Sequence, residues 1–133
     1  KASKDLKTIS KFDEVFPFSL MNEIHEHDFG ASFNNEIFGK IQKALNEYRK
    51  PDFIFLNQSI EKTNLQLNNK LQEFSKMLGI NSGPIHNPNF SRIPVMYDNP
   101  TEDEMKVIKQ VEDLADEVFD LYSKIKRMAH QKL

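Results

Sequence analysis

Apolar residues recur at alternating steps of three and four along residues 101–133, and this spacing places them on one face of a single long α-helix. The stripe consists of Met105, Ile108, Val111, Ala115, Val118, Tyr122, Ile125 and Ala129. Thr101 and Glu104 have the spacing of a capping box, in which a hydroxyl and a carboxylate each accept a hydrogen bond from a free backbone N–H at the helix start. We therefore predict a helix from Thr101 to Leu133 against which the earlier segments pack.

Three shorter helices are predicted before it, over about 17–27, 34–50 and 57–79. The expected starting or capping residues are Pro17 for the first helix, Ser32 or Asn34 for the second, and Asn57 for the third. Gly30 and Gly79 are expected to end the first and third helices, with Gly30 at positive φ, and Pro51 to end the second.

Three segments lie outside these helices. Residues 1–11 are polar and lysine-rich, and they form either a frayed lead-in or a short helical extension. Residues 53–56 are predicted to be an apolar connector, because no alternating segment nearby offers a strand partner. Residues 80–100 contain four prolines and four asparagines, which predicts a long irregular loop that is either functional or laid over the surface.

These elements predict an all-α fold, a single domain over residues 1–133 that is similar to a four-helix bundle. Its Pro/Asn-rich crossover loop precedes the long C-terminal helix. A chain of 133 residues is long enough to bury one continuous core.

Composition narrows the classes of function. A net charge of −2, with 29% charged residues of both signs, gives no global field that attracts nucleic acid, so we expect no nucleic-acid partner. The chain has no cysteine, which excludes disulfides, thiolate metal sites and a cysteine nucleophile. No apolar run reaches the length of a membrane span, and no cofactor is expected.

Four potential metal ligands, His25, Glu26, His27 and Asp28, follow one another in the sequence. Two imidazoles two residues apart point to different sides of a helix, and they converge only if the backbone turns near Gly30. Zinc requires three or four convergent ligands. The metal hypothesis takes His25, His27 and Asp28 as ligands, and the alternative is an exposed polar helix end.

Part of the C-terminal apolar stripe keeps a seven-residue spacing, which is typical of helices that pair with a second copy. Under this hypothesis Val118, Tyr122 and Ile125 form the interface of a homodimer. It predicts that Val118→Asp dissociates the dimer.

Three short stretches together resemble the soluble portion of small bacterial proteins of no known activity. They are His27 to Gly30 with Ser32 and Phe33, Phe55 and Leu56 leading into Ile60, Leu67, Leu71 and Phe74, and Ala115 to Val118 with Leu121 and Tyr122. Such proteins often carry hydrophobic helices at the N-terminus. The resemblance implies that Lys1 lies just beyond a membrane anchor or a coiled segment, which would leave this domain in the cytoplasm.

No acid, base and nucleophile stand at a recognisable spacing. We therefore expect a non-catalytic helical interaction or sensory domain of a bacterial protein, with a protein partner or self-association. Two alternatives stay open. One is a metal-dependent hydrolase or nuclease that uses His25, His27 and Asp28, and the other is a homodimerising structural bundle.

Overall fold

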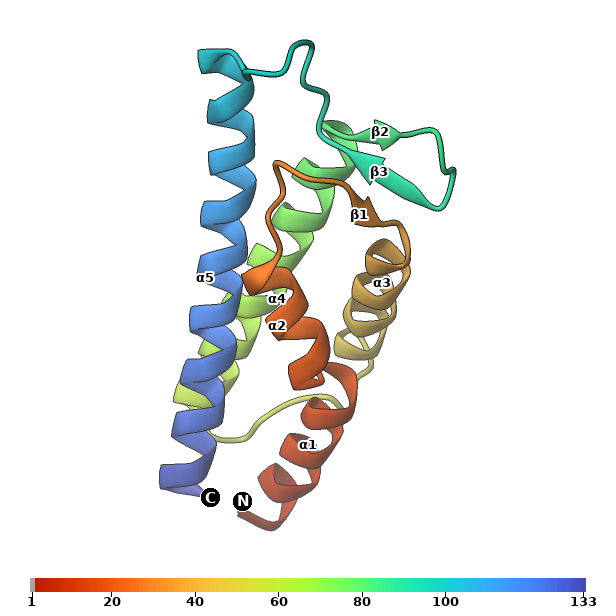
Figure 1. Ribbon diagram of the computed structural model, residues 1–133. Helices are drawn as coiled ribbons and strands as arrows, with labels where there is room; N and C mark the ends of the chain where they lie inside the picture. Colours follow the sequence, from red (N-terminus) through yellow and green to blue (C-terminus); the bar gives the residue numbers. More distant parts are fainter. Residues whose placement is uncertain (1) are drawn as a thin grey trace.

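The computed structural model describes residues 2–133, which form five helices and a small three-stranded sheet (Figure 1). The helices are α1 (Ala2–Val15), α2 (Phe18–Glu26), α3 (Glu36–Tyr48), α4 (Gln58–Ile80) and α5 (Glu102–Lys132), and the strands are β1 (Phe33–Asn34), β2 (Gly83–Pro84) and β3 (Phe90–Arg92). The mostly helical structure confirms the all-α prediction. None of these helices combines the length and the apolar composition that a membrane span requires.

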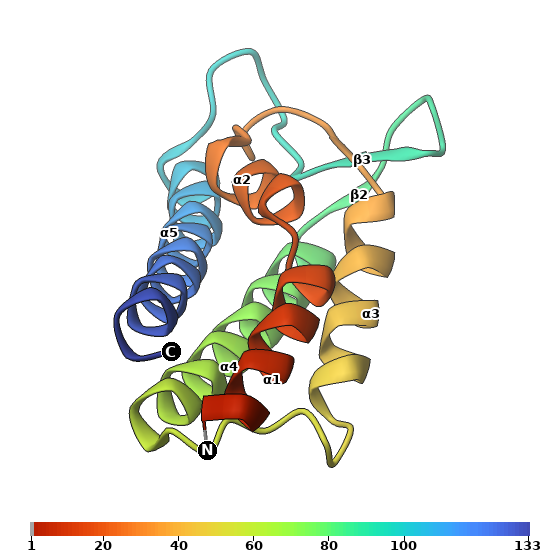
Figure 2. The same cartoon turned by 90° about the horizontal axis from the view of Figure 1, so that it is seen from below.

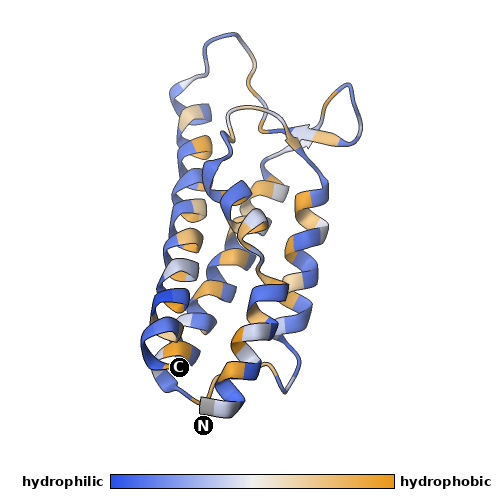
Figure 3. Cartoon of the chain, turned by 60° about the horizontal axis from the view of Figure 1, so that its bottom comes forward, coloured by the Kyte–Doolittle hydropathy of each residue, from blue (hydrophilic) through white to orange (hydrophobic). Residues whose placement is uncertain are grey.

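The long helices α4 and α5 run side by side, and α1, α2 and α3 lie against them (Figure 2). Hydrophobic positions of α5 face the other helices and hydrophilic positions face outward (Figure 3). The apolar stripe of α5 is buried from Val111 to Ala129, but Met105, at its beginning, is 57% exposed. The core therefore covers most of the predicted stripe and leaves the first turns of α5 uncovered.

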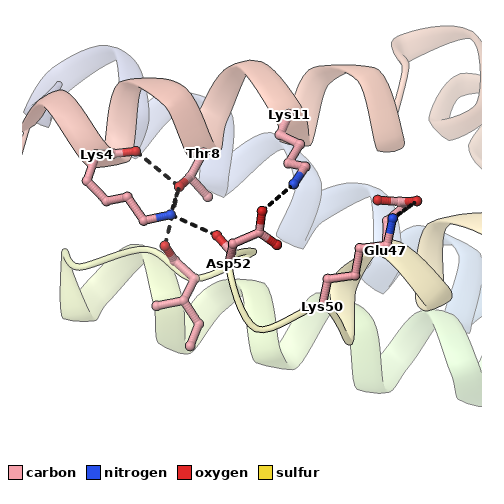
Figure 4. Close-up of polar contacts among 7 residues, drawn as sticks. Lys4, Thr8, Lys11, Glu47, Lys50 and Asp52 are labelled. Atoms are coloured by element: carbon pink, nitrogen blue, oxygen red, sulfur yellow. Dashed lines mark hydrogen bonds and ion pairs between the residues drawn. The ribbon is translucent and has the colours of Figure 1, made fainter.

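The segment at the N-terminus is a helix that the fold holds in place, although Lys1 itself lies outside the described residues. Asp5 is 1% exposed, and its carboxylate accepts hydrogen bonds from the backbone N–H groups of Leu56 (2.7 Å) and Asn57 (2.9 Å). Lys4 donates to the carbonyl oxygen of Asp52 (Figure 4). Of the two alternatives for residues 1–11, the structure selects the helical one and adds a fifth helix to the four predicted.

A break at Phe16 and Pro17 separates α1 from α2. Pro17 has a φ of −65° and a ψ of 147°, and it is the N-cap of α2, where a missing backbone N–H costs nothing. Phe12 lies at the end of α1, fully buried, with its ring stacked on that of Tyr122 in α5 at 6.0 Å. These aromatic contacts fix the angle at which α1 reaches the core.

The predicted helix starts are confirmed more fully than the predicted ends. Asn57 accepts from the N–H of Ile60, and both hydrogen bonds of the Thr101–Glu104 capping box are present. At the C-terminus of α4 the prediction is wrong by one residue, because the helix continues through Gly79 to Ile80. There Asn81 donates from its side chain to the carbonyl of Met77 at 2.9 Å, which satisfies a terminal acceptor without glycine.

The expected turn at Gly30 is also built differently. No glycine among residues 2–133 has a positive φ. Instead the Asp28 carboxylate accepts from the N–H of Gly30 at 2.8 Å, a local side-chain turn that needs no left-handed residue. The N-cap position of the helix that follows is Asn35, whose side chain makes no capping hydrogen bond. Of the two predicted residues, Asn34 does bind the start of the helix, because its side chain accepts from the N–H of Glu36 at 2.9 Å.

Residues 80–100 are partly regular, which corrects the prediction of an irregular loop. β3 lies at the centre of the sheet, antiparallel both to β1 and to β2, in the order β1-β3-β2. Phe33 pairs with Ser91, and Gly83 pairs with Arg92. Pro84 is accommodated because β2 is an edge strand. The loop thus crosses one end of the bundle as a short sheet, and only residues 93–101 form an arch to α5 (Figure 1).

Candidate functional site

The structure places His25, His27 and Asp28 at the junction of α2 and α5, around a surface hollow of about 290 Å³. Glu112 and Asp116 of α5 line the other side of this hollow. The three predicted residues thus line one depression between two helices, and four carboxylates are part of its lining.

His25 is held against α5 by its ring. The imidazole stacks on Phe119 with 4.1 Å between ring centroids and an interplanar angle of 10°. Its Nε2 lies 3.6 Å from a carboxylate oxygen of Asp116, and its Nδ1 lies 3.1 Å from Glu26 Oε1 without hydrogen-bond geometry. His25 therefore serves as a packing contact between α2 and α5 beside two acidic groups.

His27 and Asp28 have other contacts. The His27 ring stands edge-on to Phe29 at 4.8 Å, and its Nε2 is buried without a hydrogen-bond partner among the described residues. The Asp28 carboxylate accepts from the N–H of Gly30, as described above. Glu112 accepts from the N–H of Phe29 at 3.1 Å, so a second carboxylate of this hollow is engaged by backbone.

A metal ion would need at least three of these side chains to converge. Within residues 2–133, no group of three histidine, aspartate or glutamate side chains has an arrangement that could hold a metal ion. His25, His27 and Asp28 adjoin one hollow, but each is directed to a different neighbour. The geometry lends no support to the hydrolase and nuclease hypothesis.

The residues proposed for a dimer interface lie inside the domain. Val118 and Ile125 are fully buried, and Tyr122 is 7% exposed and stacked on Phe12. Burial raises the pKa of the Tyr122 hydroxyl above its ordinary value, and the charge of Lys126 acts in the opposite direction. This chain's own helices thus occupy the face that a second copy was expected to cover, so the dimer hypothesis loses the residues named for it.

A different surface stands out at the N-terminal end of α5. The side chains of Met96, Tyr97 and Met105 are 78%, 70% and 57% exposed. We call these three side chains the cap surface. Met96 and Tyr97 adjoin in sequence, and the N–H of Met96 binds the side chain of Glu104, the residue before Met105. Exposed apolar groups that gather on a folded domain commonly mark a site of interaction.

The capping box holds the cap surface in place. The carboxylate of Glu104 accepts from the N–H of Thr101 at 2.7 Å and from the N–H of Met96 at 2.9 Å. These two backbone hydrogen bonds hold the pKa of Glu104 below its ordinary value, because they stabilise the charged form. The backbone of Met96 is thereby tied to Glu104, the residue that precedes Met105 in α5.

The surroundings of the cap surface are acidic. Asp98, Glu102 and Asp103 are exposed, and none of them has an ion-pair partner among residues 2–133. Lys106 is the nearest basic residue in sequence. Apolar groups with an acidic rim suit a partner that is apolar on one face and basic around it.

Sequence reasoning missed the cap surface. Met105 was assigned to the buried stripe by its helical spacing, and Met96 and Tyr97 were placed in an irregular loop that was expected to be either functional or laid over the surface. The available signal was the charge pattern, since three consecutive acidic residues begin the helix beside these apolar side chains. The exposure itself depends on where the core ends, which helical spacing does not reveal.

Comparisons with protein-family models, with curated proteins and with solved structures find no match to this chain. The class that the fold defines is a small helical domain with a three-stranded sheet at one end of its helices.

Proposed function

We propose that this chain is a non-catalytic helical interaction domain, and that its cap surface binds a basic amphipathic helix of a partner protein. The observation that carries the proposal is the exposure of Met96 and Tyr97, on a segment tethered to Glu104 by the N–H of Met96, and of Met105 at the start of α5. Methionine side chains are flexible and polarisable, so they adapt to the apolar face of a helix. A tethered loop also loses less conformational entropy on binding than a free one.

Charge complementarity decides the chemistry of the partner. The side chains of Asp98, Glu102 and Asp103 are free to pair with lysine or arginine beside the partner's apolar stripe. An acidic helix would meet like charges around the same apolar groups and would be repelled. The contacts of His25, His27 and Asp28 support a structural role for those residues and so support a domain without catalysis.

The test uses two designed peptides with the same leucine positions on one helical face. One carries lysine on its polar face, and the other carries glutamate. We expect the Leu/Lys peptide to shift the methyl NMR signals of Met96 and Met105, and the Leu/Glu peptide to leave them unchanged. Raising the salt concentration should weaken the binding, because exposed charges are screened.

The matched variants are Met96→Asp in the cap surface and Leu65→Asp on α4, where Leu65 is 47% exposed. Met96→Asp should weaken binding of the Leu/Lys peptide by about tenfold or more, the scale expected for losing one central apolar contact. Leu65→Asp should leave it unchanged. The proposal fails if both peptides bind alike, if neither binds, or if Leu65→Asp has the same effect as Met96→Asp.

A further inference from the structure

A surface hollow lies where the α1–α2 break faces α3. Its volume is about 460 Å³, within the range of roughly 300–1,000 Å³ that small-molecule sites occupy. Val15, Pro17 and Leu20 form its apolar part. The break at Pro17 turns α2 away from the line of α1 (Figure 2). The hollow is lined by residues on both sides of this break and by residues of α3.

Three lysines and three glutamates line the hollow. Two of these six charged side chains, Lys11 and Glu47, form ion pairs with residues that are not part of the lining. Lys11 donates to a carboxylate oxygen of Asp52 at 2.8 Å, and Lys50 donates to Glu47 at 2.8 Å (Figure 4). The hydrogen bond to Asp52 raises the pKa of Lys11 above its ordinary value, so this pair stays charged and matched.

The other four charges are Glu14 of α1, Glu23 of α2, and Lys40 and Lys43 of α3. Lys40 Nζ lies 3.7 Å from Glu23 Oε2, which is too long for a hydrogen bond. Neither Glu14 nor Lys43 has an ion-pair partner among residues 2–133. The hollow thus presents one negative and one positive side chain without an ion-pair partner, Glu14 and Lys43, beside the Lys40–Glu23 ion pair and the apolar part of its lining.

We propose that this hollow binds a small zwitterion, a molecule that carries an amine and a carboxylate on an apolar frame. Free amino acids and short peptides are the class with this chemistry. A ligand with a single charge would pair with one side of the hollow but would meet like charge on the other. A zwitterion can pair its ammonium with Glu14 and its carboxylate with Lys43, while its apolar part covers Leu20.

The experiment is an NMR titration of the ¹⁵N-labelled chain with leucine, phenylalanine, lysine and glutamate at millimolar concentration. N-acetylleucine and leucine amide serve as probes, because each retains only one of the two charges. We expect at least one free amino acid to shift the backbone signals of Leu20 and Lys43. Its single-charge derivatives should bind at least about tenfold more weakly, since each lacks one charge-assisted pairing.

Two variants test the residues. Lys43→Met and Glu14→Gln should each weaken binding of the zwitterion by about tenfold, the effect of removing one charged partner from a site. Lys109→Met, which changes an exposed lysine of α5, should leave it unchanged, and thermal unfolding checks that all three variants fold.

The proposal is overturned if no amino acid shifts these signals, if the single-charge probes bind as well as the zwitterion, or if Lys109→Met weakens binding as much as Lys43→Met. Met96→Asp serves as a further control, because the cap surface is a separate site. A zwitterion that binds this variant normally distinguishes failure of the interaction proposal from failure of this one.

Discussion

Glu104 illustrates how one residue couples the start of α5 to the exposed surface beside it. Its carboxylate accepts from the backbone of Thr101 and of Met96 while it lies at the third position of the helix, near the positive end of the helix dipole. One charged group therefore binds the N–H of the N-cap residue Thr101 and, through the N–H of Met96, tethers the loop that precedes the helix. The interaction proposed for the cap surface depends on that charge being present.

The pH dependence of this arrangement follows from the depressed pKa of Glu104. Its ordinary value is 4.5, and the folded protein holds it lower. The charged Glu104 stabilises the folded state, and this contribution is complete at pH values above the pKa that Glu104 has in the unfolded chain. The contribution is lost as the pH falls through the lower pKa that Glu104 has in the folded chain. We predict that ¹³C NMR titration gives a lower pKa for Glu104 in the folded chain than in urea, and that the Met96 amide loses its hydrogen-bond shift over the same acidic range.

Glu104→Gln is the control for this prediction. The amide keeps the shape of the side chain and an acceptor oxygen but has no titrating charge, so the pH-dependent change at Met96 should disappear. An equal pKa in the folded and unfolded chains would contradict the role assigned to Glu104.

At the scale of elements, α1 is attached to the rest of the fold by a buried carboxylate. Asp5 binds the N–H groups of Leu56 and Asn57 at the start of α4, and Thr8 donates to the carbonyl of Ile54 at 3.3 Å. The connector before α4 has no strand partner among the described residues, so these contacts satisfy its backbone groups. The helix and the connector should consequently unfold together.

We predict that Asp5→Ala lowers the free energy of unfolding by about 2–4 kcal/mol, because it leaves two partly buried N–H groups without their acceptor. Lys7→Ala, on the exposed side of the same helix, should change it by less than about 0.5 kcal/mol. Urea denaturation measures both. Hydrogen exchange at the amides of Leu56 and Asn57 should accelerate only in the Asp5→Ala variant. Equal effects of the two substitutions would contradict the role of Asp5 in attaching α1 to the start of α4.

At the scale of the whole molecule, the five helices share one core, in which α5 covers both the α4 face and the aromatic cluster of α1. The break at Pro17 and the arch of residues 93–101 leave two features outside this core, the zwitterion hollow and the cap surface. The sites lie on different elements, and one can be altered without the other.

Val118 tests this view of the core. The substitution Val118→Asp buries an unpaired charge and should cost about 4 kcal/mol or more, enough to unfold the domain at any protein concentration. Circular dichroism at two concentrations and sedimentation measure fold and mass. A folded Val118→Asp variant with a lower mass than the parent would instead revive the homodimer hypothesis.

Helix periods and caps were predictable because they depend on neighbours in sequence. The three- and four-residue spacing of apolar residues located α3, α4 and α5. Asn57 marked the start of α4 and Thr101 the start of α5, each through a hydrogen bond that spans three residues. Helix ends were less predictable, since a side chain such as Asn81 can replace the expected glycine. For the candidate site, the sequence located a His- and Asp-containing hollow but not the contacts that separate its ligands.

The sequence by itself thus determined that this protein is helical, where its long helices begin and which face of each is apolar. Only the tertiary structure decided that Phe33 pairs with Ser91, that Asp5 is buried, and that Met105 is exposed although it continues the apolar stripe of α5. The physical reason is the same in all three cases. Strand pairing, burial of a charge and the edge of the core depend on groups that are distant in sequence, and only the folded chain brings those groups together.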